Sequence, residues 1–408
     1  MNKLLRGIGT LLYAILIGAI IGFIIWLFLL LVYLGIHIFW ENFILEKNSK
    51  ILILIVCIIG GIVVGLCEKY IGSYPKSMEE ILHEFKKTKR VEYRTLPKAI
   101  VKIFAVLWFG GTVGPEAALS GIIGGTSTLT GEYLKYGFKR EKHEKVEIKS
   151  KFKRIFEVPY YGFYNFIDET DQKKIKNFKR VLYGSIIFFS TIMFLLLEKL
   201  DDKVSFITKF SKVIIGKKEI EYLIPLFIIG LVMVLYMAVL DKIIVRVFKP
   251  LKKYKIANAV VGGLILGGLA ISLPFVLFSG EHTLRALINT SVGLGIGMLI
   301  IIGLIKPVAS KICINTGWLG GPIFPIMFSG AAIGMASAYM LGLNMSFAAS
   351  IIMGTMLAGV LRNYKISIVL LIFFFSCNSW IIILIAAFLA EKIVKKVDQI
   401  SEMKNKNE

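Results

Sequence analysis

The stretch GGTVGPEAALSGIIGG, residues 110–125, places glycines, a Gly-Pro pair and a carboxylate in an otherwise apolar part of the chain. An unbroken apolar helix would be the simplest structure there. Proline is favoured in the first turn of a helix, because the N–H that it lacks would have no partner there. Glycine before it allows backbone conformations that other residues resist. We therefore expect a helix to begin at Pro115, after a non-helical, glycine-rich segment.

The composition is typical of an integral membrane protein. Of the 408 residues, 56% are hydrophobic and 19% are charged, and the mean hydropathy is +0.74. Soluble domains are about 45–50% apolar and about 25% charged. Residues 7–40 contain no Asp, Glu, Lys or Arg. A helix of that length exceeds the ~30 Å hydrocarbon core, so we expect it to tilt or to extend beyond the core. It is also too long for a signal peptide, so we expect it to remain in the mature protein.

The chain carries a formal net charge of +22, with 49 Lys and Arg against 27 Asp and Glu. The basic residues cluster in runs at 86–94, 151–157, 173–180 and 249–255. Basic loops beside membrane segments orient a membrane protein and contact anionic lipid. The charge therefore predicts contact with the lipid bilayer, and we expect no nucleic-acid partner.

Cysteines and histidines give no sign of a metal or cofactor site. The cysteines lack CxxC spacing, so we expect small buried hydrophobes rather than ligands or disulfides at Cys57, Cys67, Cys313 and Cys377. The four histidines are scattered along the chain. We therefore expect no metal and no cofactor.

The apolar segments indicate a single transmembrane domain, 1–408, made of two halves. Several segments, such as 99–110 and 366–376, are shorter than the about 20 residues that a spanning helix needs. Short segments interrupted by Gly and Pro are typical of broken helices that meet inside the bilayer. We place the first half-repeat at 1–200 and the second at 219–393, with a basic surface loop insertion at 135–180.

The second half contains a stretch similar to the first, GPIFPIMFSGAAIG at residues 321–334. Each stretch begins with Gly-Pro and continues to a Ser-Gly pair, Ser120–Gly121 or Ser329–Gly330. A helix start presents free N–H groups and about half a positive charge. Two such starts that meet near the membrane midplane would bind an anion without a buried Lys or Arg. The alternative is that both Gly-Pro pairs are packing kinks, since Gly and Pro are frequent in transmembrane helices.

These motifs resemble those of the CLC family of chloride channels and chloride/proton exchangers. Residues 304–334, LIKPVASKICINTGWLGGPIFPIMFSGAAIG, resemble the family's Gly-Gly-x-Phe-x-Pro segment, and residues 110–125 resemble its Gly-Lys/Arg-Glu-Gly-Pro segment. Residues 72–82, GSYPKSMEEIL, resemble a third motif, Gly-Ser-Gly-Ile-Pro-Glu, one residue short. The resemblance implies an all-α membrane protein of two inverted halves with tilted and broken helices. It also implies a homodimer with one anion path per subunit.

The resemblance also implies an anion site. Pro322 takes the place of one amide donor, and proline cannot donate, so the amides of Ile323 and Phe324 are the substitutes. Ser73 is the candidate for an inner hydroxyl ligand. The implied anion-binding residues are Gly111, Thr112, Val113, Gly114, Pro115, Gly320, Gly321, Ile323, Phe324, Pro325 and Ser73.

The sequence departs from the family where a glutamate gates the path and carries protons, because Val113 occupies that position. Valine cannot ionise, so we expect no proton coupling by the usual route. Glu116 follows in the first helical turn, either as a favourable charge at a helix start or as a displaced gate. Lys306 is either a helix-end lysine that extends to the membrane surface or a contributor to the field at the site. The family's last helix and its anion-binding tyrosine are not recognisable, so we expect the inner side to be open or differently built.

The sequence therefore predicts passive, channel-like transport of chloride or another small anion across a bacterial plasma membrane by a multi-pass protein. The alternatives are an exchanger that uses Glu116 and a non-transporting scaffold or sensor of the same fold. We do not expect an enzyme, because the sequence contains no HExxH motif and no Ser/His/Asp set.

Overall fold

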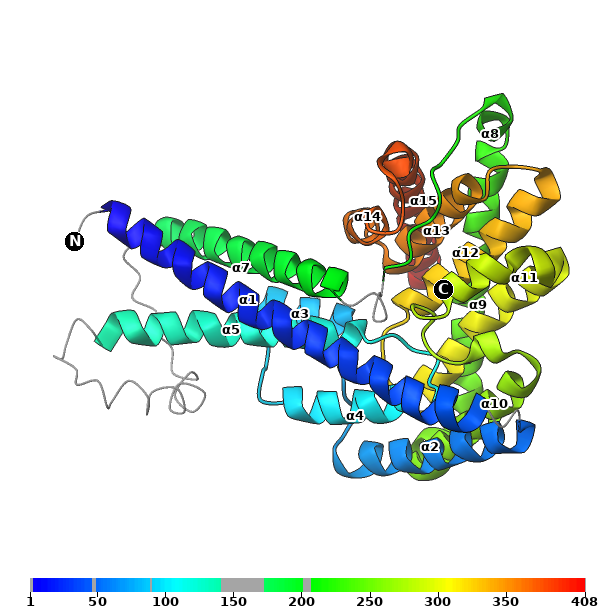
Figure 1. Ribbon diagram of the computed structural model, residues 1–408, viewed down its shortest axis with the longest axis horizontal. Helices are drawn as coiled ribbons and strands as arrows, with labels where there is room; N and C mark the ends of the chain where they lie inside the picture. Colours follow the sequence, from blue (N-terminus) through cyan, green and yellow to red (C-terminus); the bar gives the residue numbers. More distant parts are fainter. Residues whose placement is uncertain (1–2, 46–48, 89, 141–171, 201–206, 408) are drawn as a thin grey trace. The chain divides into compact units, whose positions relative to one another are not determined.

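The computed structural model describes residues 3–45, 49–88, 90–140, 172–200 and 207–407, and these ranges are mainly helical (Figure 1). The chain divides into two compact units. Unit 1 consists of Met1–Gly35, Tyr74–Ile103 and Glu116–Ser205, and unit 2 consists of Ile36–Ser73, Phe104–Pro115 and Phe206–Glu408.

Unit 1 contains long helices and the shorter segments that connect them. Its elements are α1 (Lys3–Ile36), α3 (Met78–Thr88), most of α4 (Leu96–Trp108), α5 (Glu116–Arg140) and α7 (Gln172–Leu200). Within this unit α3 and α7 both contact α5. Helices α1 and α7 approach closely where Gly18 and Gly22 face Phe189 and Ser190. The absence of a side chain at these two glycines allows the backbones to come together, as in other membrane helix pairs.

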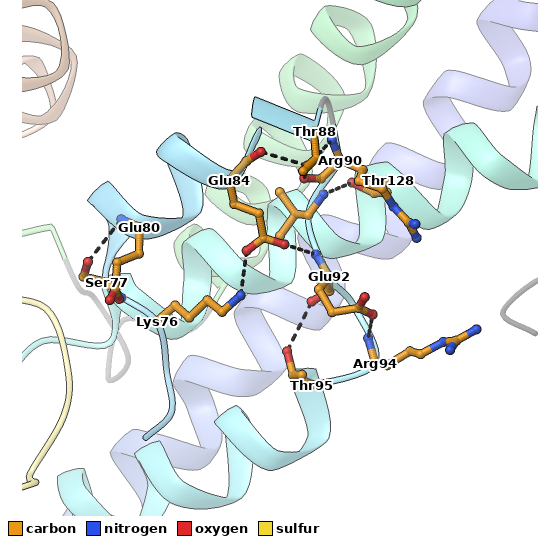
Figure 2. A network of polar contacts seen from close by, with 11 residues as sticks. Lys76, Ser77, Glu80, Glu84, Thr88, Arg90, Glu92, Arg94, Thr95 and Thr128 are labelled. Carbon is orange, nitrogen blue, oxygen red and sulfur yellow. Dashed lines mark hydrogen bonds and ion pairs between the residues drawn. The ribbon is translucent and has the colours of Figure 1, made fainter. Parts of the chain in front are cut away.

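A polar network joins α3 to the segment that follows it (Figure 2). The Glu84 carboxylate lies 2.7 Å from the Lys76 ammonium and accepts the Glu92 amide N–H at 3.0 Å. The Thr128 hydroxyl of α5 accepts the Val91 amide N–H, also at 3.0 Å. These bonds fix residues 90–95 against both α3 and α5, and therefore set where α4 begins.

Unit 2 contains α2 and all the helices after residue 206. Its elements are a π-helix (His37–Leu45), α2 (Lys50–Tyr70), α8 (Lys217–Glu221), α9 (Leu223–Phe248), α10 (Lys255–Ser272), α11 (Leu284–Asn315), α12 (Ile323–Leu341), α13 (Met345–Leu361), α14 (Tyr364–Ile372) and α15 (Trp380–Asn407). Helix α12 packs between α11 and α13, and α13 also packs against α9, α14 and α15. Nearly every residue of α12 and α13 is buried. These two helices are the core of unit 2.

The lengths and compositions of the helices confirm the prediction of an all-α membrane protein. Eight of the described helices are long and apolar enough to cross a membrane. They are Leu11–Trp40, Lys50–Tyr70, Val181–Leu200, Leu223–Phe248, Lys255–Ser272, Leu284–Asn315, Ile323–Leu341 and Cys377–Ser401. Their exposed apolar side chains are the surface that a hydrocarbon phase would cover.

The predicted helix starts are confirmed. Helix α5 begins at Glu116, directly after Pro115, and α12 begins at Ile323 with Pro322 as its N-cap. A third break was not predicted. Gly295 adopts φ 73° and ψ 166° inside α11 and interrupts the helical dihedrals there. Glycine adopts this positive φ without the steric cost that a side chain would add.

Most of the predicted basic loop, residues 141–171, lies outside the described residues, whereas 135–140 and 172–180 are helical parts of α5 and α7. Of the cysteines, Cys57 and Cys313 are buried as expected. The expectation is wrong for Cys377, which is exposed because it lies at the turn between α14 and α15.

Helices α2 and α10 pack through glycine, which yields a specific test. A Cβ on Gly263 would overlap the Cys57 carbonyl oxygen, whereas nothing lies within 4 Å of a Cβ on Gly268 of the same helix. We expect Gly263→Val to destabilise the protein by about 1–3 kcal/mol, the usual cost of overpacking. The thermal unfolding midpoint in detergent measures this change. Gly268→Val is the control and should leave the midpoint close to wild type. Equal midpoints for the two variants would contradict the packing described here.

Candidate functional site

The two glycine-proline stretches meet in unit 2. Gly114 donates its amide N–H to the Gly321 carbonyl oxygen at 2.7 Å, and Gly321 donates back to Gly114 at 2.9 Å. This reciprocal pair forms an isolated antiparallel bridge, which we call the glycine bridge. Each glycine precedes a proline and thus a helix start. The bridge therefore holds the end of one glycine-rich segment against the end of the other, as the similarity of the two motifs predicted.

Two of the predicted anion donors, the amide N–H groups of Gly114 and Gly321, are already bonded to each other's carbonyl oxygens in the bridge. The Gly111 amide donates to the Val106 carbonyl oxygen at 2.9 Å. The Thr112 hydroxyl donates to the Val276 carbonyl oxygen at 2.7 Å, and the Thr112 amide faces the Cys313 thiol. Gly111, Thr112, Gly114 and Gly321 thus serve the protein's own hydrogen bonding.

Three predicted donors remain. No hydrogen bond between described residues uses the amide N–H of Val113, Gly320 or Phe324. Val113 and Gly320 flank the bridge, and Phe324 lies in the first turn of α12, where an N–H has no helical acceptor. The prolines at 115, 322 and 325 have no N–H to offer.

Val113 is fully buried and packs against Gly320, where a Cβ would overlap its side chain. The position that the resemblance assigns to an ionisable gate is therefore occupied by an apolar side chain next to the bridge. Glu116, the other candidate gate, is the first residue of α5 and belongs to unit 1. Its proposed role as a displaced gate stays a prediction.

Lys306 was expected either to extend to the membrane surface or to contribute to the field at the site. It is fully buried, so it does not extend to the membrane surface. Its ammonium lies within hydrogen-bonding distance of four successive carbonyl oxygens, those of residues 275–278, at 2.8–3.3 Å, and its three N–H groups are shared among them. It also lies 4.6 Å from the centre of the Phe328 ring in α12. This geometry compensates the buried charge with backbone dipoles and an aromatic face.

The turn held by Lys306 in turn holds the first glycine-rich segment. The Phe278 amide donates to the Gly110 carbonyl oxygen at 3.0 Å, and the Val276 carbonyl accepts the Thr112 hydroxyl. Trp40 packs edge-on against Phe278, with ring centres 5.3 Å apart. Lys306 thus positions residues 110–112 through residues 275–278. The only signal in the sequence was a lysine inside an apolar run.

A buried acid lies near this lysine. Glu281 is 2% exposed, accepts a hydrogen bond from the Ser279 hydroxyl, and interacts electrostatically with Lys306. Its sequence context, GEHTL at residues 280–284, indicated no role. Among the residues that the structure describes, no three His, Cys, Asp or Glu side chains gather as a metal site would require.

The second glycine-rich segment is held by a different route. The Trp318 indole donates to the Ala259 carbonyl oxygen of α10 at 2.9 Å, and the Thr316 side chain faces Gly262 of the same helix. Ser73, the predicted inner ligand, follows α2 and donates its hydroxyl to Glu68 at 2.5 Å. The predicted hydroxyl ligand therefore already has an acceptor.

Comparison with known proteins identifies similar sequences and folds. Residues 176–395 match the model of the voltage gated chloride channel family. A search of curated proteins found no match. Among solved structures, a slow cyanobacterial Cl⁻/H⁺ antiporter is 18% identical with a TM-score of 0.72, covering 95% of this chain and 94% of that chain. A CLC-type fluoride/proton antiporter is 16% identical with a TM-score of 0.67, covering 97% of this chain and 98% of that one. A eukaryotic CLC transporter is 15% identical with a TM-score of 0.63, covering 97% of this chain and 73% of that one.

The four bonds of Lys306 predict that it stabilises the fold far more than a surface lysine of the same helix. We expect Lys306→Met to lower the free energy of unfolding by about 3 kcal/mol, because hydrogen bonds to a charged donor contribute about 1.5–3 kcal/mol and the carbonyls of residues 275–278 lose their charged donor. Lys311→Met is the control. Lys311 is paired at 2.7 Å with Asp241, which is half exposed, and such pairs contribute about 0–1 kcal/mol. Denaturant unfolding in detergent micelles measures both, and similar losses in the two variants would refute the role of Lys306.

Proposed function

The chain belongs to the voltage-gated chloride channel family, and from this we propose that it transports chloride or another small anion passively across a membrane. The observation that carries the proposal is the glycine bridge, with unbonded amides on both sides of it. Members of the voltage-gated chloride channel family are transporters or channels rather than enzymes, so we propose that this protein transports an anion and catalyses no reaction.

The proposed anion site consists mainly of backbone amides. A chloride ion needs donors in place of its hydration shell, and amide N–H groups supply them without a counter-charge that would trap the ion. We assign this role to the amides of Val113, Gly320 and Phe324. The start of α12 adds the partial positive charge of a helix N-terminus. Ser73 is the proposed inner ligand.

The proposal of passive transport rests on Val113. A proton carried against an anion needs a group that ionises, and valine has none. A coupled exchanger is the second candidate, because the solved structures similar to this chain include a Cl⁻/H⁺ and a fluoride/proton antiporter. Such an exchanger would need another carboxylate, and Glu116 is the nearest one to Val113 in the sequence.

The cellular location and the assembly of the protein are further parts of the proposal. The protein is a multi-pass membrane protein of the CLC fold, and we propose the bacterial plasma membrane as its location. We also propose a homodimer with one anion path in each subunit, arranged as two inverted half-repeats at 1–200 and 219–393.

The first test is efflux from liposomes that contain the purified protein. Valinomycin and potassium set the voltage, while external chloride and pH are recorded together. We expect chloride to leave without proton movement. Proton movement coupled to chloride would overturn the passive mechanism and favour the exchanger. No flux of any halide, nitrate or fluoride would overturn transport altogether and favour a non-transporting scaffold or sensor.

Val113→Glu should create a gate at the bridge. At pH 7.5 the new carboxylate lies beside Gly320, and its negative charge competes with the anion for the site. Because an ionised group within a membrane protein acts strongly on an ion path, we expect the flux to fall by roughly tenfold. Lowering the pH to 4.5 should restore flux by neutralising the carboxylate. The Val113→Gln side chain has nearly the same size as that of Val113→Glu but carries no charge, so the flux through this variant should not depend on pH. Identical pH profiles for the two variants would contradict a site at Val113.

A further inference from the structure

Exposed basic side chains gather in unit 2 where α9 ends and α10 begins. We call them the lysine patch, and its members are Lys69 at the end of α2, Arg246 and Lys249 at the end of α9, Lys252 and Lys253 in the turn, and Lys255 at the start of α10. No Asp or Glu occurs between residues 242 and 255. Asp241, just before them, pairs with Lys311 at 2.7 Å. Apart from Lys255, which lies 3.8 Å from Glu68, no patch residue forms an ion pair with another described residue. The patch therefore carries an uncompensated positive charge.

The elements that carry the patch are held together. Helix α10 packs along α2 (Figure 1), and the 3₁₀ turn Pro250–Lys253 packs against both α9 and α10. Lys255 donates to the Glu68 carbonyl oxygen at 3.1 Å and so ties the start of α10 to the end of α2. The cations therefore project from a fixed backbone rather than from a loop of its own.

Two exposed apolar stripes end at the lysine patch. Each has a residue on about every turn of its helix, so that the residues share one face. The α9 stripe, with side chains 47–64% exposed, is Leu235, Val239, Ile243 and Val247. The α2 stripe is Ile55, Ile59, Ile62 and Leu66. Both stripes are surfaces that hydrocarbon would cover.

Two exposed tyrosines mark the level at which these stripes end. Tyr70 follows the α2 stripe, and Tyr254 lies in the turn after α9. The ammonium groups of Lys69 and Lys253 lie 5.2 and 5.9 Å from the centres of these two rings. Tyrosine favours the boundary between hydrocarbon and water. The lysine patch is therefore at the level of the lipid headgroups.

The length of the α9 stripe matches one leaflet. At a rise of 1.5 Å per residue, Leu235 and Val247 are about 18 Å apart along the helix. One leaflet contributes about 15 Å of the ~30 Å hydrocarbon core. An acyl chain that lies along this stripe therefore brings its headgroup to the lysine patch.

The other end of α9 differs. Its lysines at 217 and 218 are followed directly by acids, Glu219 and Glu221. The Lys218 ammonium donates to the Gly342 carbonyl oxygen at 3.3 Å. Positive charge is therefore less concentrated at this end, although Lys209, Lys212 and Lys217 are exposed there too.

We propose that the lysine patch binds the phosphate headgroup of an anionic glycerophospholipid, with an acyl chain along the α9 stripe. The phosphate oxygens accept charge-assisted hydrogen bonds from the ammonium groups. The apolar stripe beside the patch selects a lipid over free phosphate, because burial of the acyl chain adds to the binding free energy. The bound lipid stabilises the junction of α2, α9 and α10. This inference does not depend on which ion the protein transports.

The thermal unfolding midpoint of the full chain in detergent micelles tests the proposal. Dioleoylphosphatidylglycerol and dioleoylphosphatidylcholine have the same acyl chains, and the first is anionic whereas the second is zwitterionic. A ligand that binds the folded state raises the midpoint. We expect phosphatidylglycerol to raise the wild-type midpoint by roughly 5 °C more than phosphatidylcholine does.

Two triple variants with the same change of charge locate the effect. Lys249→Gln with Lys252→Gln and Lys253→Gln should lose most of the difference between the two lipids. Lys209→Gln with Lys212→Gln and Lys217→Gln changes the other end of α9 and should keep it. Equal differences in the two triple variants would overturn the proposal, as would a wild type that does not distinguish the two lipids.

Two measurements on the wild type complete the test. Inorganic phosphate added with phosphatidylcholine should leave the midpoint unchanged, and a rise equal to that with phosphatidylglycerol would overturn the assignment to a lipid. At 1 M NaCl the Debye length is about 3 Å, so the difference between the lipids should disappear. A full difference at that salt concentration would overturn the proposal even if the patch variant fails to fold.

Discussion

The structure depends on the need to satisfy backbone polar groups in a place without water. An unwound segment at membrane depth must pair its N–H and C=O groups within the protein or face a cavity. The glycine bridge pairs two such groups on each segment with one another. Next to the bridge, Gly320 must lack a side chain, because a Cβ there would overlap the side chain of Val113. The prolines that follow, Pro115 and Pro322, have no N–H to pair, so each glycine-rich segment continues directly into a helix.

The two segments that meet at the bridge are supported differently. The first is held by a turn, residues 275–278, whose carbonyl oxygens converge on the Lys306 ammonium. The second lies on α10, through the Trp318 indole and Thr316. One support is a buried charge and the other is helix packing. A repeated motif in the sequence therefore does not imply a repeated support in the structure.

Features that depend on local chemistry were predictable from the sequence. The helix starts after Pro115 and Pro322 follow from the conformational preferences of Gly-Pro, and the spans follow from apolar length. The similarity of the two motifs was enough to predict that they meet. The partners of the individual donors were not predictable. The acceptor of the Thr112 hydroxyl is Val276, 164 residues away, and the Lys306 acceptors are carbonyls that every residue possesses. No residue type signals such a partner, so the fold must be known before the free amides can be separated from those already bonded.

The burial of nearly every residue of α12 and α13 has a consequence for how the protein is made. During synthesis, α12 and α13 leave the ribosome before α15, which later covers α13. In the finished protein these two helices contact other helices over nearly all their surface. Until α15 arrives, the face of α13 that it will cover is in contact with lipid or with the insertion machinery. The core of unit 2 is therefore completed only after translation of the last described helix, and a chain truncated before Trp380 would leave that core open.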